Sequence, residues 1–279
     1  RDYSVRGLAE VMDRFGEEVD AWTGREATAY SVEVLAEDAP VALDLLADMV
    51  VRPALPAAEL EREREVVAAE AAMVREDPES RLWEELARAA WPGSTAGRSV
   101  LGDPEVIAGT GAQSLAEYHQ RHYTGGRVLV VVAGDVAPEA VLEQVEAGFG
   151  GLPTGDRPPT AIPELVPGAD QVPAATEQAH IALCAPGPGR TAPERFAAGV
   201  ANHLLGASVT SRLFREVREE RGLAYTVYSD LDTLRDCGLW GIYLACAVEA
   251  REGTEALVTG ILDEVAAAGF PEGEGARAR

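Results

Sequence analysis

Six prolines in residues 151–176 set the main limit on how this 279-residue chain can fold. Proline has no backbone N–H and a fixed φ, so such a stretch can neither continue a helix nor lie within a central strand. We therefore expect a linker over residues 151–176, between a domain over residues 1–150 and a domain over residues 177–279. The six are Pro153, Pro158, Pro159, Pro163, Pro167 and Pro173.

The same order of elements is expected on both sides of this linker. Each half shows the periodicity of a helix, two strands and a helix, at residues 4–15, 18–23, 28–35 and 39–51, and at residues 211–221, 223–229, 239–248 and 252–268. The repeat predicts an α+β fold of two homologous domains. Each domain is expected to be a mostly antiparallel sheet with helices packed on one face.

The first half contains further elements that the second half does not repeat. Apolar spacing predicts four more helices, at residues 57–75, 80–90, 114–122 and 138–149. The run over residues 127–132 is apolar and rich in valine, and it predicts a strand.

The formal net charge of −23 excludes some classes of partner. Phosphate contacts need clustered basic side chains, so we expect no nucleic acid partner. No apolar run approaches the ~20 residues needed to span a bilayer, so we expect no membrane partner. Solubility is the simpler explanation of the acidity, and attraction of basic peptides is the alternative.

Three cysteines, Cys184, Cys237 and Cys246, are an odd number at no metal-site spacing. Free thiols in a reducing compartment are the simpler explanation, and they indicate a cytoplasmic location.

The helix expected over residues 57–75 carries an unusual arrangement of carboxylates. Leu60, Val67 and Val74 lie seven residues apart, which places them on one stripe with a drift of only about 20° per step. Glu63 and Glu70 fall between them at i+3 spacing, on the same side of the helix. A carboxylate turned toward a core must be ion-paired, protonated or bound to a metal. An ion pair or a position at the rim is the more common case, and a metal site is the alternative.

Residues 63–70, Glu-Arg-Glu-Val-Val-Ala-Ala-Glu, resemble the downstream glutamate motif of the insulinase and mitochondrial-processing-peptidase family, the inverted zincins. In that family, two histidines of an H-x-x-E-H helix and one distant glutamate bind zinc. The resemblance makes Glu70 the zinc-ligating glutamate and Glu63 a second carboxylate that supports the site. It implies a LuxS/processing-peptidase-like fold.

The resemblance extends to other segments of the first half. Asp20, Ala21 and Trp22 resemble the family's edge strand, which binds substrate by strand addition, although the family usually has Asn at the position of Asp20. Residues 91–93 with 101–102, and residues 127–136, resemble later segments of the same domain. Residues 1–150 would then be the peptidase domain.

Residues 211–225 resemble the family's signature arginine and tyrosine, which are seven residues apart and match Arg218 and Tyr225. The implied roles are substrate binding and hydrogen bonding to the developing oxyanion. The alternatives are a surface ion pair for the arginine and a core-edge position for the tyrosine. Residues 177–279 would then be a substrate-binding domain.

The family's H-x-x-E-H motif does not occur in this sequence. Motif alignment places it about ten residues before Arg1. The only close pair of histidines, His119 and His122, has no acid between its members, and capping or surface roles are expected for both. The second domain is likewise expected to continue beyond residue 279. These residues supply one of three zinc ligands and no general base, so alone they are expected not to hydrolyse peptides.

The resemblance implies a zinc-dependent endopeptidase that cleaves peptides or unfolded segments and forms a homodimer, or a heterodimer with another family member. The alternative is a non-catalytic binding or structural subunit of a heterodimeric peptidase. Such a subunit has no chemical reason to keep Glu63, Glu70, Arg218 and Tyr225 together, which favours the peptidase. An acidic protein-binding module unrelated to proteolysis explains the composition but not these motifs.

Overall fold

The structure, a computed structural model, describes residues 5–16, 19–155 and 161–275. The chain divides into two compact units. Unit 1 consists of Arg1–Ala68 and Gly102–Thr160, and unit 2 consists of Ala69–Leu101 and Ala161–Arg279. Residues 69–101 of the first half therefore pack with the second half of the sequence. The domains expected at residues 1–150 and 177–279, with their linker, stay a prediction.

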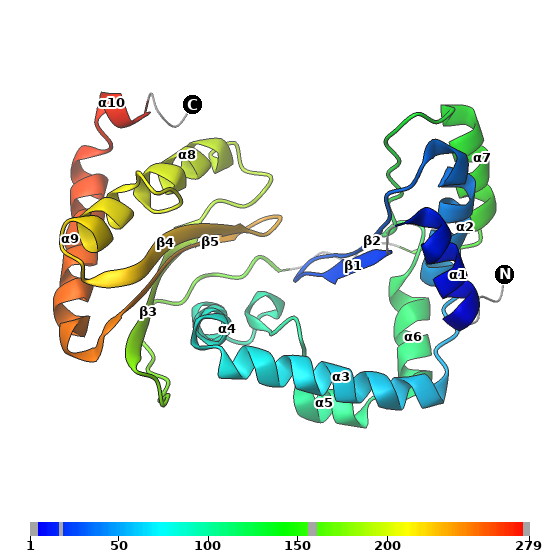
Figure 1. The fold of residues 1–279 in the computed structure, drawn as a ribbon, viewed down its shortest axis with the longest axis horizontal. Coiled ribbons are helices and arrows are strands. Elements are labelled where there is room, and N and C mark those ends of the chain that lie inside the picture. The colour runs from blue at the N-terminus through cyan, green and yellow to red at the C-terminus, as the bar shows by residue number, and fades with distance from the viewer. Residues whose placement is uncertain (1–4, 17–18, 156–160, 276–279) are drawn as a thin grey trace. The chain divides into compact units, whose positions relative to one another are not determined.

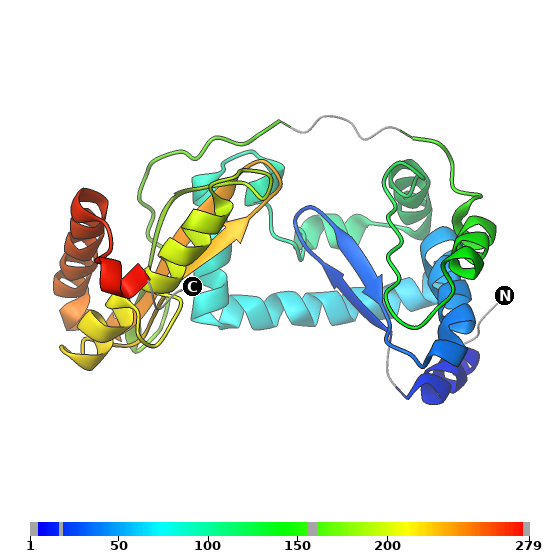
Figure 2. The ribbon, with the colours of Figure 1, turned by 90° about the horizontal axis from the view of Figure 1, so that it is seen from above.

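Unit 1 is a set of helices beside a small hairpin. Its elements are α1 (Val5–Phe15), β1 (Asp20–Thr23), β2 (Thr28–Ser31), η1 (Ala36–Asp38), α2 (Ala39–Val51), the first part of α3 (Ala57–Glu76), α5 (Pro104–Gly109), α6 (Ala112–His122) and α7 (Pro138–Phe149). Strands β1 and β2 pair antiparallel, from Asp20 with Ser31 to Thr23 with Thr28. Helix α7 packs along α2 (Figures 1 and 2). A small core forms around Phe15, Ala42 and Leu45.

Unit 2 is built on a three-stranded antiparallel sheet. The strands are β3 (Gln178–Gly187), β4 (Ala224–Thr233) and β5 (Gly238–Ala247), in the order β3-β5-β4. The helical elements are the end of α3, α4 (Pro78–Ala90), η2 (Thr95–Gly97), α8 (Arg195–Leu205), η3 (Phe214–Glu219), η4 (Val248–Ala250), α9 (Arg251–Ala268) and α10 (Glu272–Gly275).

The central strand β5 is buried on both faces, because side chains alternate along a strand. Ile242, Leu244 and Cys246 pack into a core with residues of α8, η3 and α9. On the opposite face, Leu239 packs with residues of α4, and a Cβ atom on Gly241 would meet the Trp83 ring at 2.3 Å. The α+β class and the antiparallel sheets are confirmed. The prediction of helices on only one face of each sheet is wrong for unit 2. There α8, η3 and α9 pack on one face of the sheet, and α4 packs on the other.

Most predicted elements are confirmed, and two have the bounds expected from the sequence, α2 and α7. The strand predicted over residues 127–132 is wrong. This segment is not a strand, and Leu129 and Val131 are 85% and 77% exposed. A strand requires hydrogen bonds to a neighbour, and none of the described strands pairs with this segment. The strand predicted over residues 28–35 ends at Ser31 for the same reason.

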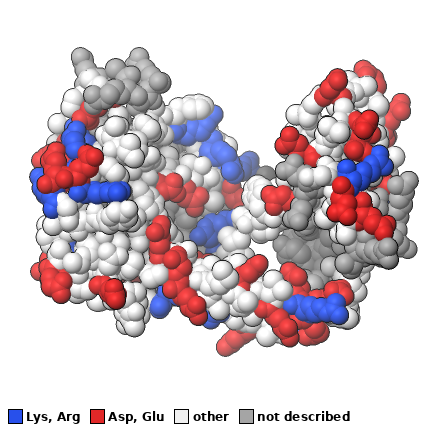
Figure 3. Space-filling view, viewed as in Figure 1, with Lys and Arg blue, Asp and Glu red and all other residues white. Residues whose placement is uncertain are grey.

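Two general predictions can be compared with the described residues. All three cysteines are free, as expected. None of the helices in the described ranges is both long and apolar enough to cross a membrane. Figure 3 shows acidic side chains spread over both units on the face in view, in keeping with the net charge of −23. The absence of a nucleic acid partner stays a prediction.

Candidate functional site

Helix α3 carries the two carboxylates that the sequence singles out. Leu60, Val67 and Val74 are half-buried, which confirms the predicted apolar stripe. Glu63 and Glu70 are both exposed, so the expectation that they turn toward a core is wrong. The physical reason is their phase: a residue three positions along a helix lies about 60° around from the stripe. Both carboxylates therefore stand at its solvent-facing border.

The glutamates of α3 differ in their partners. Glu59 binds Arg62 at 2.9 Å, and Glu61 binds Arg64 at 2.6 Å. Among the described residues, neither Glu63 nor Glu70 has a hydrogen bond or an ion pair. The ion pair that is the commoner explanation for such glutamates is therefore not formed, and both carboxylates remain able to accept bonds from a ligand.

A zinc site requires three or four protein ligands in one place. No group of three His, Cys, Asp or Glu side chains in the described ranges could hold a metal. His119 Nε2 lies 2.7 Å from the carbonyl oxygen of Val50, and His122 Nδ1 lies 2.8 Å from Arg127 Nη1. Both histidines thus have structural roles, as expected. Glu70 offers one exposed carboxylate, so the described residues do not form a zinc site by themselves.

Strand β1 has one paired edge and one open edge. It pairs with β2, and no other described strand lies beside it. All four of its residues are exposed, including Asp20, Ala21 and Trp22, whose side chain is 54% exposed. An open strand edge presents backbone N–H and C=O groups that an extended peptide can pair with. The predicted substrate-binding segment has the geometry that strand addition needs.

Two irregularities of the backbone bring Arg218 and Tyr225 together. Arg218 lies in η3, a π-helix, where the N–H of Glu220 donates to the carbonyl oxygen of Arg215, five residues back, at 2.9 Å. Gly222, at a φ of 62°, then reverses the chain into β4. The pairing of β4 with β5 shifts register between Ala224 and Thr226, which makes Tyr225 the extra residue of a β-bulge. No sequence pattern predicts either irregularity.

The side chains of Arg218 and Tyr225 are in direct contact. The Arg218 Cζ atom lies 4.4 Å from the centre of the Tyr225 ring, within the range of a cation–π interaction. Tyr225 is 76% exposed, so it is not a core-edge tyrosine. Both π-helices and β-bulges are frequent at functional sites, where they re-aim side chains.

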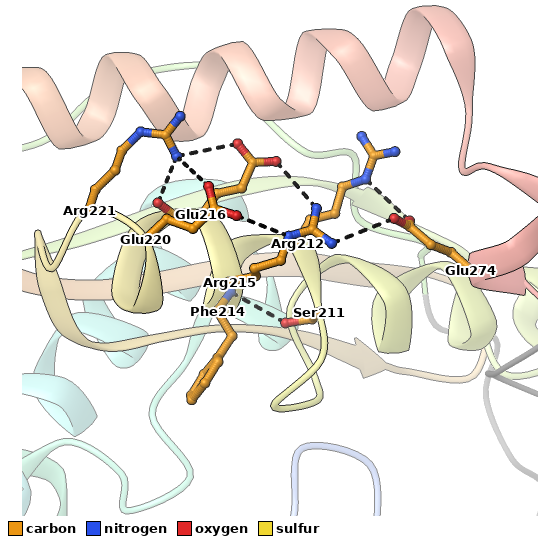
Figure 4. Close-up of polar contacts among 8 residues, drawn as sticks. All are labelled: Ser211, Arg212, Phe214, Arg215, Glu216, Glu220, Arg221 and Glu274. Atoms are coloured by element: carbon orange, nitrogen blue, oxygen red, sulfur yellow. Dashed lines mark hydrogen bonds and ion pairs between the residues drawn. The ribbon is translucent and has the colours of Figure 1, made fainter.

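The arginines near Arg218 are all held by carboxylates (Figure 4). The pairs are Arg212 with Glu274 (3.4 Å), Arg215 with Glu220 (3.6 Å) and Arg221 with Glu216 (3.5 Å). Arg218 forms no ion pair with any described residue. The surface ion pair that was the alternative explanation for this arginine is thus not formed, and its N–H groups remain available to a ligand.

The predicted residues are distributed over the two units. Strand β1 and Glu63 belong to unit 1, and Glu70, Arg218 and Tyr225 belong to unit 2. The structure brings Arg218 against Tyr225, and it places Glu63 and Glu70 two turns apart on α3.

Two family models of the same peptidase family match this chain, one in each half. The family model described as "Insulinase (Peptidase family M16)" matches residues 1–104, and the model described as "Peptidase M16 inactive domain" matches residues 111–279. An uncharacterized zinc protease of Mycobacterium tuberculosis is 36% identical over 277 residues, which cover 97% of this chain and 63% of that protein. The chain thus spans under two thirds of the length of this relative.

More distant proteins are similar to this chain in sequence or in fold. The beta subunit of mitochondrial-processing peptidase from Lentinula edodes is 28% identical over 261 residues, which cover 86% of this chain and 55% of that protein. A crystal structure of a protease from Helicobacter pylori superposes with a TM-score of 0.89 at 20% identity, covering 100% of this chain and 70% of that one.

Proposed function

We propose that this chain, which belongs to the insulinase family of peptidases (family M16), is part of a zinc-dependent endopeptidase that cleaves peptides or unfolded segments. The observation that carries the proposal is the pattern of ion pairing around Arg218. Three neighbouring arginines are neutralised by glutamates, while Arg218 forms no ion pair with any residue that the structure describes and contacts Tyr225. A side chain kept free among paired neighbours is suited to a ligand.

Each group has a role in this proposal. The open edge of β1, at Asp20, Ala21 and Trp22, pairs with the backbone of an extended peptide. Arg218 and Tyr225 are the catalytic groups that donate hydrogen bonds to a substrate oxygen as negative charge develops on it. An arginine suits this task because its donors are fixed in a plane and its charge is permanent.

Zinc is the cofactor implied by the family, and the names of relatives support it. In peptidases it acts as a Lewis acid toward the peptide carbonyl and lowers the pKa of water. We propose Glu70 as one ligand and Glu63 as its supporting carboxylate, with the remaining ligands outside this sequence. A homodimer, or a heterodimer with another family member, and a location in the cytoplasm are part of the same proposal.

The test uses the full-length protein encoded by the gene. Translation of the coding region upstream of Arg1 should reveal an H-x-x-E-H motif, and the purified protein should cleave unfolded peptides and contain about one zinc per chain. Glu70→Gln should lose most of the zinc. Glu65→Gln is the matched control, because Glu65 is an exposed glutamate of the same helix with no partner among the described residues. Equal zinc content in the two variants would remove Glu70 from the site.

The second candidate is a non-catalytic subunit of a heterodimeric peptidase. Two observations favour it: residues 111–279 match a model described as an inactive domain, and one relative is named as a subunit. An upstream sequence without the two histidines, together with a full-length protein that binds no zinc, would select this candidate.

A further inference from the structure

A second aromatic contact of Arg218, with Phe214, is not accounted for by the proposed function. The Arg218 Cζ atom lies 4.6 Å from the centre of the Phe214 ring, in addition to its contact with Tyr225 at 4.4 Å. Phe214 and Arg218 are four residues apart on η3, and Tyr225 is on the bulge of β4. One guanidinium thus contacts two rings from two different elements.

Phe214 belongs to none of the hydrophobic cores that the described residues form. Leu213 and Val217, on the same turn, are fully buried and belong to the core beneath the sheet of unit 2. Phe214 is only half-buried and is absent from the hydrophobic clusters of the described residues. Figure 4 shows its ring pointing to the opposite side of η3 from the ion-paired arginines. Arg218 is therefore the identified partner of the Phe214 ring.

The contact between Phe214 and Arg218 differs from an ion pair in which part of the guanidinium it occupies. A carboxylate partner occupies the N–H groups of a guanidinium, as happens at Arg212, Arg215 and Arg221. A ring interacts with the guanidinium through its π face and takes up no N–H group. Aromatic contacts can thus hold an arginine in place while all five of its donors stay free for a ligand.

We infer that Phe214 is a positioning residue, which together with Tyr225 fixes the guanidinium of Arg218 with its N–H groups free for an oxygen of the bound peptide. The inference rests on the proposed function for the identity of the ligand. The position of the guanidinium can be tested without that function. The π-helix contributes by placing the pair on one side while Leu213 and Val217 remain in the core.

The first test is NMR of the full-length protein with ¹⁵N-labelled arginine. Two rings close to one guanidinium should shift the Arg218 side-chain signal upfield of the other arginine signals, with the assignment made by its loss in Arg218→Lys. Phe214→Met keeps an apolar side chain without a ring and should move the signal downfield. Phe214→Tyr should restore it. An Arg218 signal at the ordinary position in the wild-type protein would overturn the inference, whether or not any variant folds.

The second test is kinetic. Phe214→Met should lower kcat/KM for a cleaved peptide by about 3- to 30-fold, as expected for loss of one cation–π contact. Phe214→Tyr should recover it to within about twofold. The matched control is Phe196→Met, since Phe196 also contacts an arginine, Arg195 at 4.0 Å, but lies in α8 and is 69% exposed. Equal losses in both Met variants would overturn the inference. A wild-type protein that cleaves no peptide would overturn the proposed function instead, and the NMR result would still decide the role of Phe214.

Discussion

The indole N–H of Trp83 donates a hydrogen bond to the hydroxyl of Tyr228, at 2.7 Å and across 145 residues of sequence. Tyr228 in turn donates to the carboxylate of Glu79 at 2.6 Å. These bonds attach α4 to the sheet of unit 2. Because α4 follows directly on α3, they also fix the end of the helix that carries Glu70 to the sheet that carries Tyr225.

We expect Trp83→Phe to destabilise the protein by about 1–3 kcal/mol. The variant removes a part-buried hydrogen bond, for which the typical net contribution is about 0.5–1.5 kcal/mol, and also the distal indole atoms Cη2 and Cζ3 that lie nearest Gly241. Urea denaturation followed by circular dichroism measures the change. Trp22→Phe is the control, because Trp22 is exposed on β1 and should change stability by less than about 0.5 kcal/mol. Equal effects of the two substitutions would show that the bond to Tyr228 contributes nothing.

Two glycines should respond to alanine in opposite directions. A Cβ atom on Gly241 would lie 2.3 Å from the Trp83 ring, so Gly241→Ala forces α4 away from the sheet and should cost about 1–3 kcal/mol. Gly260 lies in α9 with nothing within 4 Å of its Cβ position. Gly260→Ala should stabilise the protein by about 0.5–1 kcal/mol through helix propensity. Thermal unfolding of both variants checks the two signs. A neutral Gly241→Ala would mean that Trp83 does not pack there.

Tyr243 should make the protein sensitive to alkaline pH. Burial, aided by the nearby carboxylates Glu79 and Asp77, raises the pKa of Tyr243 to about 12. The corresponding group in the unfolded chain has a pKa near 10. Between about pH 10 and pH 12 the unfolded chain therefore binds fewer protons than the folded chain, and stability falls as pH rises. The stability that Tyr243 contributes through its raised pKa is therefore fully present below about pH 10 and is lost as pH rises toward 12.

The measurement is the urea midpoint from neutral pH to above pH 11. Tyr243→Phe should flatten the alkaline decline, although at neutral pH it loses the hydrogen bond between Tyr243 and His180 Nδ1. Tyr118→Phe is the control, because Tyr118 is 58% exposed in α6. An unchanged alkaline slope in Tyr243→Phe would contradict the assignment.

The spacing of apolar residues predicted the helices whose buried face can be recognised within the segment itself. Helices α2 and α7 have the expected bounds, and the stripe of Leu60, Val67 and Val74 on α3 is half-buried as expected. The contact of α4 with the sheet was not predicted. It depends on Trp83 meeting Gly241 across the fold, and no local pattern contains that information.

In the candidate site, too, the sequence predicts the residue types, while contacts across the fold determine their surroundings. The residue types at Glu63, Glu70, Arg218 and Tyr225 can be recognised from sequence. Helical phase places the two glutamates at the border of the apolar stripe, and how far neighbouring elements cover that border is a tertiary property. The strand expected at residues 127–132 has the composition of a strand and no described partner, because pairing is a tertiary property. The contact between Arg218 and Tyr225 depends on a π-helix and a bulge, both of which interrupt the regular pattern.

Strand addition at β1 makes a prediction about substrate backbones rather than side chains. In an added strand, alternate residues turn their N–H groups toward β1, and the others turn theirs away. A short peptide cleaved by the full-length protein should therefore lose most of its affinity when one alternate set of backbone nitrogens is methylated. The same peptide methylated on the other set, with equal size and charge, should bind nearly as well as the parent. Isothermal titration with a zinc-depleted protein separates binding from cleavage. Equal affinity of the two methylated peptides would rule out pairing with the open edge at Asp20, Ala21 and Trp22.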